Sequence, residues 1–90
     1  MKYLIDSDKV AEFLKGIPNT IRLISSLPQD ELAISLITYG EIYEGIYFGT
    51  DPRKHEQGFL IFLRGVEVLP LNKRIMKRFA QLRGNLRSQG

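Results

Sequence analysis

The chain has 90 residues, 43% hydrophobic and 26% charged with a formal net charge of +3, which supports one small domain over 1–90 and excludes a multidomain enzyme. The absence of cysteine excludes disulfide scaffolds and thiol chemistry, and the single histidine, His55, argues against multi-histidine metal sites and Ser–His–Asp catalysis. No apolar run nears the ~20 residues of a membrane span and no signal peptide opens the chain, so we expect a cytoplasmic protein without membrane contact.

The first predicted elements are a buried strand and a helix. The apolar run Tyr3-Leu4-Ile5 predicts a strand, which ends abruptly at the carboxylate of Asp6. Ser7 is expected to cap the helix that follows, and Gly16 to stop it.

A second helix and a second strand follow. Ile17-Pro18-Asn19 begins a helix with an apolar stripe formed by Ile21, Ile24 and Leu27. Residues 28–31 predict a polar turn. Leu32-Ala33-Ile34 predicts a short buried strand, and Ser35 is expected to cap the next helix.

The middle of the chain predicts two consecutive helices. The first carries apolar and aromatic residues at three- and four-residue spacing, namely Tyr39, Ile42, Tyr43, Ile46 and Tyr47. Gly49 closes it, and Asp51-Pro52 opens the second in the favoured order of cap and first-turn proline. This second helix should run to about Arg64, although its segment 59–63 alone could pass for a strand.

The last predicted elements are a strand over Val66–Leu69 and an amphipathic helix capped by Asn72. The inner stripe of that helix comprises Ile75, Phe79, Leu82 and Leu86. The alternation of strands and helices predicts an α/β fold with three layers, in which a parallel sheet carries helices on both faces. Ligand sites in such sheets lie beyond the carboxyl ends of the strands.

Acidic side chains gather at that predicted edge. Asp6, Ser7 and Asp8 follow the first strand, and Glu41 lies on the helix that leaves the second. Oxygen donors of this kind suit Mg²⁺ or Mn²⁺, which bind a few carboxylates together with waters or phosphates. The structural alternative is that Asp6 caps a helix and Asp8 is a favourable first-turn acid.

Two segments resemble motifs of the PIN-domain family. Tyr3-Leu4-Ile5-Asp6-Ser7-Asp8 is similar to the family's opening strand, which runs into Asp and then Thr or Ser. Residues 34–45, with Glu41 and Gly45, resemble its second motif, in which a Ser/Thr-rich turn precedes a glutamate. Leu69-Pro70-Leu71-Asn72 looks like the corresponding stretch of VapC-type toxins.

This resemblance implies a Mg²⁺- or Mn²⁺-dependent endoribonuclease toxin that cuts RNA and is held inactive by a cognate antitoxin. Asp6 and Glu41 would be the catalytic, metal-ligating acids and Asp8 a further ligand. The supporting hydroxyl side chains would be Ser7, Ser35 and Thr38.

The carboxy-terminal part departs from the family pattern. PIN domains continue with further strands and acidic residues, whereas residues 68–90 contain no acid. The chain therefore resembles the amino-terminal portion of a truncated PIN-like domain that lacks the carboxy-terminal strands. Two ligands should bind a metal weakly, so we expect weak or no activity, and an open sheet edge predicts a homodimer or higher assembly.

The basic carboxy-terminal helix and the tyrosine-rich helix have two interpretations each. RNA phosphates could be contacted by Lys73, Arg74, Lys77 and Arg78, although a solvated outer face explains the same residues. By resemblance to VapC-type toxins, a dimer or antitoxin interface would include Tyr43, Tyr47 and Phe48. Packing in the core is the alternative for the tyrosines.

Two rival functions stay open at this point. A non-catalytic binding module could grip an antitoxin or a partner protomer through its apolar helices. Asp6-Ser7-Asp8 also fits the opening of haloacid-dehalogenase-like phosphatases, in which Asp6 would be the nucleophile and Asp8 the acid–base. The residues Lys9-Val10-Ala11 do not continue that pattern.

Overall fold

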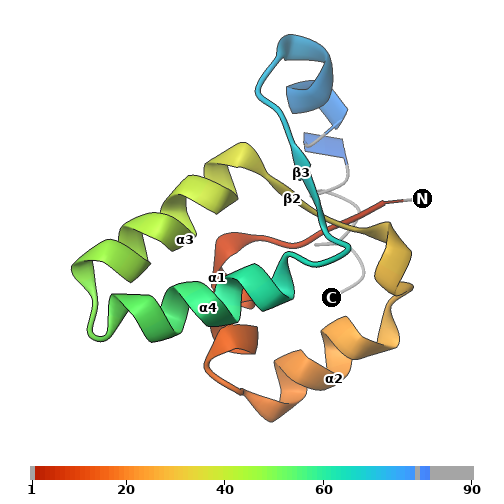
Figure 1. Ribbon diagram of the computed structural model, residues 1–90. Coiled ribbons are helices and arrows are strands. Elements are labelled where there is room, and N and C mark those ends of the chain that lie inside the picture. The colour runs from red at the N-terminus through yellow and green to blue at the C-terminus, as the bar shows by residue number, and fades with distance from the viewer. Residues whose placement is uncertain (1, 79, 82–90) are drawn as a thin grey trace.

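The computed structural model describes residues 2–78, 80 and 81, which form a parallel three-stranded sheet and the helices around it (Figure 1). The strands are β1 (Tyr3–Leu4), β2 (Leu32–Ser35) and β3 (Glu67–Leu69), in the order β1-β2-β3. The helices are α1 (Ser7–Leu14), α2 (Pro18–Ser26), α3 (Leu36–Phe48) and α4 (Pro52–Phe62), and the 3-10 turn η1 (Gln29–Glu31) lies between α2 and β2. Residues 73–78, 80 and 81 are helical as well. The predicted α/β fold is confirmed.

The strand register brings the carboxyl ends of all three strands to one edge of the sheet. Leu4 pairs with Ala33, and Ser35 pairs with Leu69. The amide of Ile5 extends the first pairing, since it donates to the carbonyl oxygen of Ala33 at 2.9 Å. Asp6 and Ser35 therefore leave the sheet on the same side.

The two faces of the sheet carry cores of different size. Helices α1 to α4 cover one face and bury a large cluster with strand residues, namely Ile5, Val10, Ile24, Leu32, Ile34, Ile42, Ile46, Phe59 and Phe62. The opposite face buries Leu4, Ala33 and Leu69, against which Ile75 packs from the helix that follows β3. Helices on both faces are thus confirmed, with an uneven distribution. The predicted stripe positions Phe79, Leu82 and Leu86 lie outside the described residues.

The cap of α1 differs from the prediction. Asp6, and not Ser7, is the N-cap, because its Oδ1 accepts the backbone amide of Lys9 at 3.0 Å. Ser7 is the first helical residue. The predicted stop at Gly16 is confirmed by its φ of 81°, a left-handed conformation that favours glycine.

The predicted stripe of α2 is wrong at one position. Ile21 is exposed, whereas Thr20 and Ile24 are the buried residues of this helix. Thr20 tolerates burial because its Oγ1 donates to Glu12 Oε1 at 2.6 Å. At the other predicted boundaries, the caps Ser35, Asp51 and Asn72 are confirmed. No helix within residues 2–78, 80 and 81 has the length and apolar character needed to cross a membrane.

The pairing of Thr20 with Glu12 makes the stability of the fold depend on pH. The hydrogen bond from Thr20 and the nearby Lys9 ammonium lower the pKa of Glu12 below its ordinary value of 4.5. A lowered pKa means that this stabilisation is present above pH 4.5 and is lost as the pH falls through the folded-state pKa. We expect Thr20→Val to reduce the unfolding free energy at pH 7, and to reduce it less once the pH falls below the folded-state pKa of Glu12.

Denaturant titrations of the wild type and Thr20→Val across this pH range measure the effect. A difference that is the same at every pH would assign the contribution of Thr20 to packing, since the pairing with Glu12 would then add nothing.

Candidate metal centre

The candidate centre lies where α1 and α3 leave the sheet at one edge (Figure 1). Asp6 stands at the start of α1 and Ser35 at the start of α3, and the two helices pack against each other. This arrangement follows from the parallel strands, because the helix that follows each strand begins at the same edge of the sheet.

One carboxylate oxygen of Asp6 forms a hydrogen bond within α1, and the other could bind a ligand. Oδ1 caps α1 through the amide of Lys9. Asp6 is half-buried, and within the described residues no lysine or arginine forms an ion pair with it, since Lys2 pairs with Glu67 and Lys9 with Glu12. Its remaining oxygen can accept a metal ion or water.

Two buried hydroxyl groups fix the start of α3. Ser35 Oγ accepts the backbone amide of Thr38 at 3.0 Å and donates to Thr38 Oγ1 at 3.3 Å. Both side chains are buried, and their mutual bonds satisfy them. Their observed role is to hold the start of the helix that carries Glu41. A role in supporting a metal site stays a prediction.

The other predicted acids are exposed. Glu41 lies one turn after Thr38 on α3, and Asp8 lies in the first turn of α1, where it is favourable for the helix. Among residues 2–78, 80 and 81, no three acidic or histidine side chains form a cluster that could hold a metal. A shared ion between Asp6 and Glu41 stays a prediction, and its donor set fits Mg²⁺, which commonly uses one or two carboxylates plus waters and phosphates.

The predicted RNA contacts lie on the helix that follows β3. The side chains of Lys73, Arg74, Lys77 and Arg78 are all exposed. Since β3 runs parallel to β2, this helix leaves the sheet on the side of Asp6 and Ser35. The exposure fits a solvated face and a phosphate contact equally.

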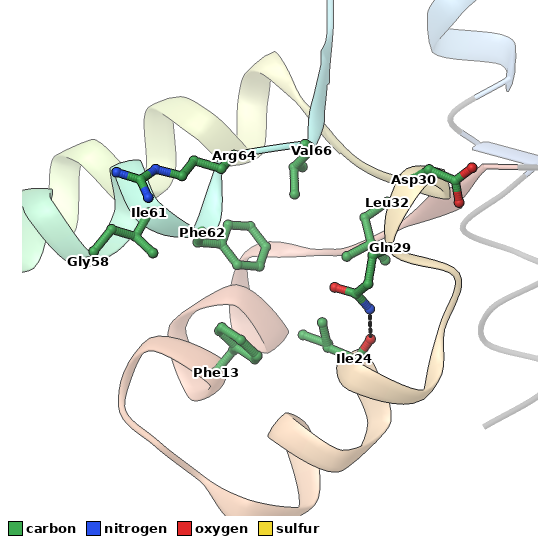
Figure 2. Close-up of a pocket in the computed structure, with 11 residues that line it drawn as sticks. Phe13, Ile24, Gln29, Asp30, Leu32, Gly58, Ile61, Phe62, Arg64 and Val66 are labelled. Atoms are coloured by element: carbon green, nitrogen blue, oxygen red, sulfur yellow. Dashed lines mark hydrogen bonds between the residues drawn. The ribbon is translucent and has the colours of Figure 1, made fainter.

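An apolar groove between α1, α2 and α4 was not predicted from the sequence (Figure 2). Its volume is about 560 Å³, and apolar side chains line most of it, namely Phe13, Ile24, Leu32, Ile61, Phe62 and Val66. Asp30 and Arg64 add charge to the lining, and the Gln29 amide is held by the carbonyls of Ile24 and Leu27. One signal was available in the sequence: the run 59–63 holds more apolar residues than one helix face can bury.

Of the three predicted interface residues, Tyr43 packs between α3 and α4, whereas Tyr47 and Phe48 lie at the surface. The Tyr43 hydroxyl donates to Glu56 Oε2 at 2.9 Å, and its ring packs on Phe59 with centroids 5.6 Å apart. The hydrogen bond to Glu56, together with burial, raises the pKa of Tyr43 above its ordinary value. Tyr43 therefore fastens α3 to α4, whereas Tyr47 and Phe48 are exposed.

Comparison with known proteins finds relatives along the whole chain. No family model matches. Ribonuclease VapC1 from Haemophilus influenzae strains R2866 and 86-028NP is 27% identical over 92 residues, covering 100% of this chain and 69% of the relative. A crystal structure of VapBC2 from Rickettsia felis, bound to a DNA fragment from their promoter, matches with a TM-score of 0.73 at 19% identity, covering 100% of this chain and 70% of that one.

Proposed function

We propose that the chain is a VapC-type, PIN-like metal-dependent endoribonuclease that acts as the toxin of a toxin–antitoxin pair, because its similarity to Ribonuclease VapC1 and to the VapBC2 structure covers its whole length. The observation that carries this proposal is the parallel register, which starts α1 at Asp6 and α3 at Ser35 on one edge of the sheet. RNA is the proposed substrate, and the cytoplasm the proposed location.

Asp6 and Glu41 would hold Mg²⁺ or Mn²⁺, with Asp8 as a further ligand. When bound, such an ion polarises a phosphate and lowers the pKa of a water. The amide of Lys9 restrains Asp6 by engaging one carboxylate oxygen, which leaves the other to ligate the metal. Ser35 and Thr38 keep the first turn of α3 in place, and with it the position of Glu41.

With Asp6 and Glu41 as its main ligands, and with no three acidic side chains clustered within the described residues, the centre should bind metal weakly. Each missing carboxylate leaves a coordination position to water, and affinity for hard cations falls with the number of charged ligands. We therefore propose that cleavage needs high metal concentrations, with the substrate phosphate completing the coordination.

The groove is the proposed binding site for the antitoxin. Its apolar lining fits an apolar peptide segment, and Arg64 could pair with an acid of that segment. A second copy of this chain is a further proposed partner. If the groove binds a partner and no RNA is cut, the chain is the non-catalytic module considered as the alternative.

Glu41→Gln tests the nuclease directly, with Glu44→Gln as its matched control. Both glutamates are exposed on α3, three residues apart, and both changes remove one charge. We expect Glu41→Gln to slow Mg²⁺-dependent RNA cleavage by a factor on the order of 10²–10³, because it removes a metal ligand, and Glu44→Gln to change it by less than about threefold.

Gel analysis of a structured RNA, with Mg²⁺ titrated and with EDTA added, measures both effects. Cleavage that persists in EDTA, or equal rates for the two variants, would exclude this metal centre.

A further inference from the structure

The turn between α3 and α4 presents two aromatic rings to solvent. Phe48 is 88% exposed and Tyr47 is 64% exposed, at the end of α3. Figure 1 shows this turn at the end of the helical hairpin remote from the sheet. We call residues 47–55 the hairpin tip. A side chain as exposed as Phe48 contributes little to the core, whereas the Tyr47 ring also packs on Tyr43 with centroids 5.5 Å apart. The exposed surfaces of both rings are available to a ligand.

Basic residues stand directly beside these rings. Arg53, Lys54 and His55 form the first turn of α4 and are all exposed, and this turn contains no acid. The neighbouring carboxylate of Asp51 accepts the backbone amide of Lys54 at 3.4 Å, as the cap of α4. Glu56 points inward to Tyr43. Glu44, one turn before Phe48, is an exposed acid near the tip.

Exposed rings next to exposed cations match the chemistry of a single-stranded polyanion with bases. Every base offers a face for stacking on an aromatic ring, and arginine and lysine contact the phosphates between bases. We propose that the hairpin tip binds single-stranded RNA, with Phe48 and Tyr47 stacking on bases and with Arg53 and Lys54 on phosphates. This inference rests on the proposed ribonuclease function and adds a second contact for its substrate.

The length of α3 separates this contact from the candidate metal centre. Thirteen helical residues span about 20 Å at 1.5 Å per residue. An RNA strand held by the tip and cut at the sheet edge must bridge that distance. The tip therefore selects substrates with an unpaired segment long enough to reach both places.

A tryptophan at position 48 reports stacking directly, because the chain contains no other tryptophan. We expect the emission of Phe48→Trp, placed in the cleavage-defective Asp6→Asn background without metal, to be quenched by an unpaired oligoribonucleotide and not by a fully paired RNA duplex. The exposed position keeps the substitution compatible with the fold.

Two affinity measurements separate the rings from the charges. Phe48→Ala should weaken binding of the oligoribonucleotide between about fivefold and about 150-fold, the usual effect of losing one base-stacking ring. Replacing Arg53 and Lys54 by glutamine should flatten the dependence of log affinity on log salt by about 1.4, because two phosphate contacts are lost.

Unchanged tryptophan emission at saturating RNA, or unchanged affinity of Phe48→Ala, would overturn the inference. A blue shift that grows with protein concentration without RNA would also overturn it, since the ring would then be buried against a second copy. If RNA quenches the tryptophan but the wild type does not cleave RNA, the hairpin tip binds RNA and the proposed nuclease function is wrong. A failure of the inference can therefore be told from a failure of the proposed function.

Discussion

Replacing Asp6 by asparagine is expected to reduce Mg²⁺-dependent RNA cleavage by a factor on the order of 10²–10³ while leaving the stability of the fold nearly unchanged. The carboxylate has two separate duties in the proposed function. One oxygen caps α1 through the amide of Lys9, and the other would ligate the metal. An asparagine carbonyl oxygen accepts the same amide, and asparagine and aspartate are comparable N-caps. Only the charge is lost.

Asp6→Ala separates the two duties, because alanine can neither cap nor ligate. This variant should lose cleavage as well and should also lose about 0.5–2 kcal/mol of unfolding free energy. Thermal or denaturant unfolding measures the cap, the RNA assay measures the chemistry, and binding of Mn²⁺ to the folded protein measures the ligand. Stability, cleavage and Mn²⁺ binding, measured for Asp6→Asn and Asp6→Ala, thus separate the capping role of the Asp6 carboxylate from its role as a metal ligand.

The opposite pattern is equally informative. If Asp6→Asn cuts RNA like the wild type, Asp6 is a helix cap and nothing more. If Asp8→Asn abolishes turnover on phosphate monoesters, the phosphatase interpretation is correct, because only that chemistry requires Asp8 as an acid–base. A PIN-type centre should only be weakened by this change.

The fold could be predicted where local signals agree with one another. Asp51-Pro52 supplied a cap and a first-turn proline, and α4 begins there even though Asp51 adopts a φ of 50°. The strand-like run 59–63 is mostly helical because it follows that start without a break and because Phe59 and Phe62 face the core together. The parallel sheet followed from the alternation of elements.

Misassignments arose where several residues could satisfy the same local rule. Ser7 and Asp6 are both good caps, and the register with β2 decides between them by ending β1 before Asp6. Thr20 is buried and Ile21 is exposed because Glu12, eight residues earlier, supplies a partner for the hydroxyl. A pattern of hydrophobic residues contains no information on such pairings.

The candidate centre could be predicted in its location more than in its detail. Parallel strands require Asp6 and Ser35 to share an edge, and the structure has them there. The separation of Asp6 from Glu41 depends on how α3 packs on α1, which the sequence does not specify. The groove arises between three helices distant in sequence, so no single segment could reveal it.

Phe59→Ala is expected to have the largest effect on stability of any substitution considered. Phe59 is fully buried, and its ring contacts Tyr39, Tyr43 and Phe62 at centroid distances of 5.8, 5.6 and 6.3 Å. Truncating a buried phenylalanine costs about 3–5 kcal/mol, because transfer energy is lost and a cavity is left. Small domains are stable by only about 5–15 kcal/mol in total, so this loss would remove a large share of that margin.

Phe48→Ala removes the same atoms from an exposed ring and is the matched control. It should change the unfolding free energy by less than about 0.5 kcal/mol. Denaturant unfolding of the two variants measures the difference. Because Phe59 also packs against the helix that carries Glu41, a partly folded Phe59→Ala should lose RNA cleavage together with stability. Bound antitoxin peptide should restore the stability if the groove is intact, but not the cleavage, which the antitoxin inhibits. Equal stability of the two variants would mean that the α3–α4 packing contributes little and that the sheet alone holds the fold.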